Sequence, residues 1–164
     1  MRKQKGFSLI ELLIVVAIIL IIAAIAIPNL LRARMAANES SAVAAIRTLN
    51  TAEVTYNSTY PTVGYAATLA ALGPSAATPC AASSTDACLI DAVLAGGTKS
   101  GFVYNGTAAG GPPTVSYFWA ATPVTTNQTG TRSFCSYEDA VVRVLNPAGA
   151  IGTEATCQGE PPLQ

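Results

Sequence analysis

The residues with the clearest chemical potential lie at the start of a long apolar run. Glu11 belongs to KGFSLIELLIVVAIILIIAAIAIP (residues 5–28), and Gly6 lies five residues before it. If the chain is cut between Gly6 and Phe7, the new amine lies one helical turn before Glu11, on the same face. An acid is favoured near a helix N-terminus but costs about 2.5–3.5 kcal/mol at the centre of a membrane-spanning helix. We therefore predict that Glu11 pairs with the Phe7 amine of a neighbouring copy.

Three interpretations of the apolar run follow from its length and flanks. As a helix, residues 7–31 are about 37 Å long, which exceeds the roughly 30 Å of a bilayer core. Three basic residues precede the run (Arg2, Lys3 and Lys5) and would stay in the cytoplasm. A secretory signal peptide also has a basic start, and Ala24-Ile25-Ala26 resembles a cleavage site. A plain membrane anchor tolerates Glu11 near the interface. Neither of these two alternatives gives the acid a purpose.

Composition argues against an enzyme and against a nucleic-acid partner. The 164 residues include no histidine, so the commonest general base and metal ligand is missing. We expect no catalytic residue, no metal and no cofactor. The nine basic and nine acidic residues cancel, and without the first six residues the formal charge is −3. The C-terminal part offers only Lys99, Arg132 and Arg143, which make no basic stripe for DNA.

Four cysteines lie beyond the apolar run, at Cys80, Cys88, Cys135 and Cys157. Their spacing matches no zinc knuckle. An even number in a chain with an export-type start predicts two disulfides in an oxidising compartment. Of the three possible pairings we favour the sequence neighbours, and four buried free thiols are the alternative.

The remaining sequence predicts an α+β fold. Leu31, Met35, Ala42, Ile46, Leu49, Ala52 and Tyr56 recur at helical spacing, whereas Glu39 and Asn50 fall largely elsewhere. We expect one helix over 7–57, apolar over 7–31 and then amphipathic, interrupted at Pro28. Its apolar stripe should pack on a C-terminal antiparallel sheet of about four strands. The expected elements are short helices within 68–74 and 89–97, strands within 101–106, 114–122, 131–137 and 140–145, and an irregular tail from Pro147.

The N-terminal pattern resembles a known family. Lys5-Gly6-Phe7-Ser8-Leu9-Ile10-Glu11-Leu12, followed by an uninterrupted apolar run and Pro28, is similar to the class III leader junction of type IV pilins and type II secretion pseudopilins. The resemblance implies a leader peptide at 1–6, a prepilin peptidase that cuts after Gly6 and methylates Phe7, and a head at 58–164. It also implies that helix near Pro28 unwinds in the filament, and that a disulfide between Cys135 and Cys157 fastens the C-terminal tail.

The function that follows is that of a structural subunit. We expect a single-pass protein of the bacterial inner membrane that polymerises into an extracellular helical filament, served by an assembly platform and separate ATPases. The alternatives are a minor pilin, a pseudopilin of type II secretion, or a tip module for adhesion or DNA uptake. In the adhesion alternative, Tyr104, Tyr117 and Trp119 would be exposed.

Overall fold

The computed structural model describes residues 7–75, 77 and 79–163, which fall into two compact units. The first unit ends at Arg34, and the second comprises Met35–Gln164. Helix α1 (Leu9–Thr59) supplies most of the first unit and the longest helical segment of the second. Because the two units are separate bodies, each is described by itself.

Helix α1 starts and ends two residues later than the sequence predicts. It begins at Leu9 rather than at Phe7, and it ends at Thr59 rather than near Asn57. The end is later because Pro61 restricts the backbone of the residue before it, Tyr60, and leaves Asn57 to Thr59 free to stay helical. The Tyr60 N–H still donates to the Tyr56 carbonyl at 2.8 Å.

The apolar stripe of α1 is confirmed over its second half. Ala42, Ile46, Leu49, Ala52 and Tyr56 are all buried in the second unit. The prediction was wrong for the first two members of the stripe, because Leu31 is exposed and Met35 is only half-buried. Helical spacing alone does not tell where along a helix the covering layer begins.

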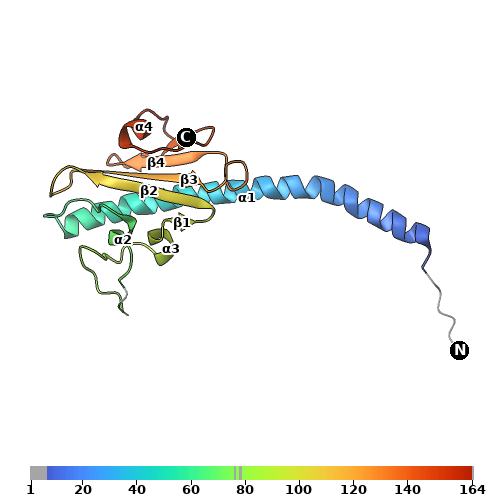
Figure 1. Cartoon of the computed structure of the whole chain (residues 1–164), viewed down its shortest axis with the longest axis horizontal. Coiled ribbons are helices and arrows are strands. Elements are labelled where there is room, and N and C mark those ends of the chain that lie inside the picture. Colours follow the sequence, from blue (N-terminus) through green and yellow to red (C-terminus); the bar gives the residue numbers. More distant parts are fainter. Residues whose placement is uncertain (1–6, 76, 78, 164) are drawn as a thin grey trace. The chain divides into compact units, whose positions relative to one another are not determined.

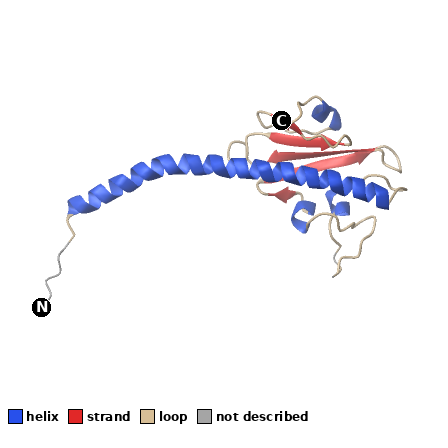
Figure 2. Ribbon diagram, turned by 180° about the vertical axis from the view of Figure 1, so that it is seen from behind, coloured by secondary structure: helices blue, strands red, loops and turns tan. Residues whose placement is uncertain are grey.

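The head contains a five-stranded antiparallel sheet packed on α1, which confirms the α+β fold (Figures 1 and 2). The strands follow chain order, so each hairpin pairs sequence neighbours. They are β1 (Thr98–Lys99), β2 (Phe102–Ala109), β3 (Ser116–Pro123), β4 (Ser133–Tyr137) and β5 (Arg143–Leu145). Four of them correspond to the predicted strands, and the two-residue β1 is an addition at one edge.

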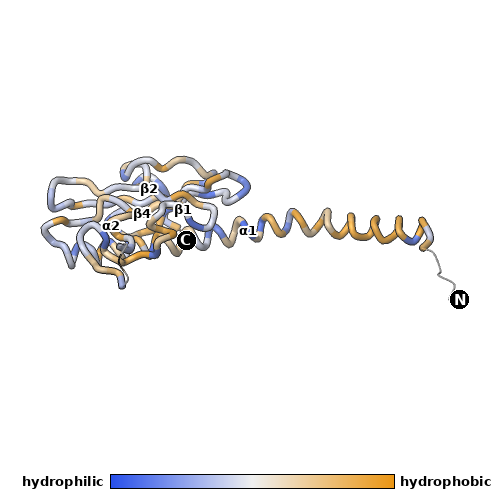
Figure 3. Tube along the Cα trace, turned by 60° about the horizontal axis from the view of Figure 1, so that its bottom comes forward, coloured by the Kyte–Doolittle hydropathy of each residue, from blue (hydrophilic) through white to orange (hydrophobic). Residues whose placement is uncertain are grey.

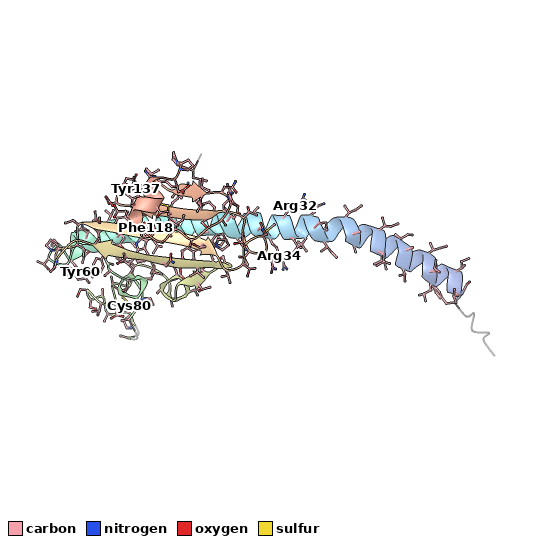
Figure 4. The ribbon with its side chains drawn as sticks, turned by 45° about the horizontal axis from the view of Figure 1, so that its top comes forward. Arg32, Arg34, Tyr60, Cys80, Phe118 and Tyr137 are labelled. Atoms are coloured by element: carbon pink, nitrogen blue, oxygen red, sulfur yellow. A yellow bond between two sulfur atoms is a disulfide. The ribbon has the colours of Figure 1, made fainter. Side chains whose placement is uncertain are left out.

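The two faces of β3 enter two different cores. Tyr117, Trp119 and Ala121 belong to the main core with α1. Phe118 and Ala120 point to the other face, where they pack with Cys135, Ile151 and Cys157. Both faces of the strand are therefore covered. Figure 4 labels Phe118 and Tyr137, which both lie on this second side.

The aromatic side chains proposed as an adhesive surface are buried instead. Tyr104, Tyr117 and Trp119 are at most 3% exposed. Large aromatic rings supply much of the apolar area that a small core must bury, so these side chains form the core of the head rather than its surface. The expectation of exposed aromatics at these positions was wrong.

Three short helices complete the head. α2 (Leu69–Leu72) and α3 (Ala92–Ala95) lie within the predicted ranges. The predicted irregular tail contains a third helix, α4 (Glu154–Gln158). It begins where the Thr153 side chain accepts a hydrogen bond from the Thr156 N–H, a standard cap. A single turn of helix has too little periodicity to be recognised from sequence.

Both disulfides join sequence neighbours, the pairing that the sequence favours. Cys80–Cys88 closes a loop between α2 and α3, and Cys135–Cys157 joins β4 to α4. Figure 4 places Cys80 in that loop. Cys135 and Cys157 are fully buried in the second core, beside Phe118 and Ile151. The second bridge therefore holds the C-terminal segment over the outer face of the sheet.

We predict that removing Cys135–Cys157 costs more stability than removing Cys80–Cys88. On the loop-entropy model the two bridges contribute about 3.4 and about 2.6 kcal/mol. The double variant Cys135→Ser/Cys157→Ser additionally loses packing around Phe118. Thermal unfolding of the full-length chain in a mild detergent measures both variants. An equal or larger loss in Cys80→Ser/Cys88→Ser would contradict the ranking.

Candidate assembly segment and the polar contacts of the head

The described part of the first unit is a predominantly apolar helical segment (Figure 3). Every large apolar side chain from Phe7 to Leu31 is between 46% and 82% exposed. Within the described part of the chain, α1 is the one helix long and apolar enough to cross a membrane. Single apolar side chains on a surface are ordinary, but a continuous apolar surface indicates contact with lipid or with another protein.

Glu11 has a local partner that the sequence analysis missed. Its Oε2 accepts a hydrogen bond from the Ser8 backbone N–H at 2.9 Å. Ser8 stands just before the first helical residue and Glu11 three residues later, which is the capping-box pattern S-x-x-E. The signal was present in the sequence. Glu11 thus stabilises the start of its own helix, and the pairing with a neighbour's amine remains a prediction.

The other predicted residues of this segment have simple environments. Phe7 is exposed, whereas Gly6 lies outside the described residues. Pro28 lies inside α1, which continues through it, so the expected interruption of the helix at this residue was wrong. Since proline has no N–H, it donates no hydrogen bond to the preceding turn. Arg32 and Arg34, labelled in Figure 4, are exposed.

In the second unit, Glu39 is buried against the start of β4. Its Oε1 accepts from the Thr131 N–H, the Thr131 hydroxyl and the Arg132 N–H, at 2.7, 2.9 and 3.2 Å. Its Oε2 accepts from Nε and Nη2 of Arg132, at 2.9 and 2.8 Å. Burial raises the pKa of Glu39, but the hydrogen bonds from Thr131 and Arg132 outweigh it and hold the pKa below 4.5.

Asn50 forms a second polar contact between α1 and the sheet. Its side-chain amide donates to the Ser136 hydroxyl at 2.9 Å and to the Ala140 carbonyl at 3.2 Å. Its Oδ1 accepts from the Tyr117 hydroxyl at 3.3 Å. Because Asn50 and Ser136 are both buried, each hydrogen bond replaces one that water would otherwise make.

Glu53 is the most buried acid in the described chain, with no exposed surface. Its Oε1 accepts from the indole Nε1–H of Trp119 at 2.9 Å, and its Oε2 accepts from the Ala66 N–H at 2.8 Å. Both donors are neutral. Burial raises the pKa of Glu53 to about 7, although these two hydrogen bonds act in the opposite direction.

The expected exposure of the helix's polar residues was therefore wrong for Glu39 and Asn50. Helical periodicity places them beside the apolar stripe, and residue type suggested a solvated face. The structure buries them because the sheet and its loops supply donors and acceptors at matching positions. Those partners lie 67 to 93 residues away in the sequence, so no local pattern identifies them.

The three cations proposed for the head are all ion-paired. Lys99 pairs with Asp91 at 2.7 Å, Arg132 with Glu39 at 2.8 Å, and Arg143 with Asp139 at 2.6 Å. Each pairing neutralises a charge that DNA binding would require to face a phosphate.

Comparisons with known proteins point to one family. A family model described as the prokaryotic N-terminal methylation motif matches residues 1–27. The chain is 68% identical over 40 residues to the type IV wide pilus major component PilA4 of Thermus thermophilus. These 40 residues are 24% of this chain and 30% of PilA4. It is 45% identical over 65 residues to the type II secretion system core protein G of Vibrio cholerae. These 65 residues are 38% of this chain and 44% of core protein G.

A third relative is the type IV major pilin protein PilA of Myxococcus xanthus, 46% identical over 54 residues, which cover 33% of this chain and 24% of that protein. The matches thus span less than half the length of each of these relatives. No solved structure matches. The methylation motif, these relatives and the fold support a relationship between this chain and type IV pilins and pseudopilins.

We predict that Glu39→Gln destabilises the head and changes its response to acid. Arg132 loses its charged, hydrogen-bonded partner, which should lower the free energy of unfolding by about 2–3 kcal/mol. Because the folded pKa of Glu39 lies below 4.5, its contribution is present above pH 4.5 and is lost as the pH falls through the folded pKa. Thermal melts of the full-length chain in detergent, between about pH 3 and pH 7, measure both effects.

The control for this prediction is Asp91→Asn, which breaks an exposed ion pair and keeps a side chain suited to cap α3. An exposed pair contributes about 0.2–1 kcal/mol. A Glu39→Gln loss no larger than the Asp91→Asn loss would contradict the prediction.

Proposed function

We propose that this chain is a structural subunit of a type IV pilus. It is inserted in the bacterial inner membrane by the helix over 7–31, cut after Gly6 by a prepilin peptidase and methylated at Phe7. It then polymerises through that helix into an extracellular filament. The leader is 1–6, the helix 7–57 and the head 58–164. An assembly platform and ATPases act as its partners.

The observation that carries this proposal is the uncovered apolar surface of the first unit. A helix whose large apolar side chains are all about half exposed or more is stable only where lipid or protein covers it. Burial of one such side chain contributes about 1.5–3 kcal/mol. The same surface therefore suits the membrane before assembly and other copies after it.

Glu11 gives the assembly its register in this proposal. Cleavage after Gly6 creates a cation at Phe7, and the Glu11 carboxylate of a neighbouring copy neutralises it inside the apolar bundle. Two charges that are each unfavourable to bury then form one pair. Pro28 contributes a position where the helix lacks one backbone hydrogen bond, which eases local unwinding during assembly.

A second candidate function is that of a pseudopilin in type II secretion. The match to core protein G spans 65 residues and 38% of this chain, more than either pilin match. Deleting the gene separates the two, since loss of surface filaments supports the pilus and loss of protein secretion supports the pseudopilus. A tip module for adhesion or DNA is less well supported, because the aromatics are buried and the head's three cations are paired.

We predict that Glu11→Ala and Glu11→Gln both reach the membrane and both are cut after Gly6, but fail to form filaments. Glutamine can cap Ser8 as glutamate does, whereas it carries no charge. Breaking a buried ion pair costs about 3–5 kcal/mol, so filament yield should fall at least about a hundredfold. The measurements are the mass of the N-terminal peptide and the yield of sheared filaments.

The glutamine variant separates the two roles of Glu11. Normal filament yield from Glu11→Gln, with loss only in Glu11→Ala, would mean that capping alone matters and the charge pair is wrong. Glu154 serves as the control position, because it lies on α4, far along the chain from the apolar segment, and its carboxylate accepts a hydrogen bond from the Gln158 side chain. Glu154→Gln should assemble normally.

A further inference from the structure

Glu53 is a fully buried acid that joins three segments of the head. It lies on α1, it accepts from the Ala66 N–H in the loop after α1, and it accepts from the Trp119 indole on β3. Ala66 and Trp119 are themselves at most 1% exposed. No step of the proposed assembly uses this group.

The environment of Glu53 contrasts with that of Glu39 on the same helix. Glu39 has the Arg132 guanidinium, whereas no ion pair in the described structure includes Glu53. The cations Lys99, Arg132 and Arg143 are engaged by other acids. A buried carboxylate with only neutral donors is poorly compensated for the water it has lost.

The titratable groups that face Glu53 are two phenols. Tyr56 lies one turn further along α1, and Tyr117 lies on β3. Burial, reinforced by the nearby Glu53 charge, raises the pKa of both hydroxyls, so both are uncharged at neutral pH. The loop adds two further phenols, Tyr60 and Tyr65, whose rings pack on Tyr56 and Tyr117 at 5.0 and 4.9 Å between centroids. Its direct contact with Glu53 is the backbone amide of Ala66. No facing group thus supplies a positive charge.

The loop at Tyr60–Ala66 is attached by a small number of contacts. The Thr114 N–H donates to the Val63 carbonyl at 2.8 Å, and the Thr114 hydroxyl donates to the Tyr65 carbonyl at 2.7 Å. Gly64 has a φ of +89°, and a Cβ there would lie 2.2 Å from the Thr114 carbonyl oxygen. The start of the loop is held to α1 by the hydrogen bond from the Tyr60 N–H to the Tyr56 carbonyl. The Ala66–Glu53 hydrogen bond fastens the other end of the loop to α1.

We propose that Glu53 is a proton-operated latch that holds the Tyr60–Ala66 loop closed over α1 and β3. The uncharged acid is compatible with burial. On ionisation the carboxyl O–H bond breaks, the electron pair stays on oxygen and the proton passes to water. Ionisation strengthens the hydrogen bonds from Ala66 and Trp119, but the larger effect is the cost of a buried charge with no cation beside it. The carboxylate therefore draws water into the seam, and the loop separates from α1.

The sign of the effect follows from the burial. Because burial raises the pKa of Glu53 from 4.5 to about 7, the acid contributes stability that is complete below about pH 4.5. That contribution is lost as the pH rises through about 7. Glu39 has the opposite sign, since its pKa is lowered. Glu39 and Glu53 thus respond to opposite ends of the pH range.

The test uses the single tryptophan of the chain as a reporter. In NMR spectra of the full-length chain in detergent micelles, the Trp119 indole N–H resonance should titrate with a midpoint near pH 7. Hydrogen exchange at the Ala66 amide, corrected for the intrinsic effect of pH, should accelerate roughly tenfold or more across the same midpoint. Glu53→Gln should abolish both changes, and Glu39→Gln should retain both.

The ¹³C resonance of the Glu53 carboxyl group in the unmodified chain makes the test independent of variant folding. A midpoint near 7 supports the latch. A midpoint at or below 4.5, an Ala66 amide whose corrected exchange rate is constant with pH, or a Trp119 titration that persists in Glu53→Gln would overturn it.

Discussion

The rest of the structure depends on one constraint: the apolar surface of the first half of α1 must be covered by something outside the chain. Its large apolar side chains from Phe7 to Leu31 are all 46% exposed or more. Water is an unfavourable environment for such a surface, which therefore requires lipid or another protein to cover it. The capping of the helix by Glu11, the position of Pro28 and the low overall charge all suit that requirement.

The second half of α1 solves a different problem, which is to hold a small head together. Apolar contacts at Ile46, Leu49 and Tyr56 provide the area, and three polar residues provide the specific attachments. Glu39 binds the start of β4, Asn50 binds the other end of that strand and Tyr117, and Glu53 binds the loop and Trp119. Polar residues with fixed donors allow only one register between a helix and a sheet, whereas apolar packing alone tolerates several.

Much of this fold was predictable because its signals are local. The periodicity of Ile46 and Leu49, the alternation of Tyr117 and Trp119 with Phe118, and the turn residues between strands each lie within a few residues. The buried acids were not predictable in the same way, because their partners Arg132 and Trp119 lie 93 and 66 residues away. Glu11 is an intermediate case. Its local capping pattern was visible in Ser8-Leu9-Ile10-Glu11, but the proposed partner belongs to another molecule.

The most direct test asks whether the apolar surface is covered in the assembled state. All four native cysteines form disulfides, so Ile18→Cys introduces the single free thiol at a position that is 53% exposed in the chain by itself. The measurement is the rate at which a water-soluble maleimide labels this thiol in intact filaments and in the same filaments dissociated by denaturing detergent. Our account predicts protection in the intact filament and full labelling after dissociation. Equal labelling rates in the two states would contradict it.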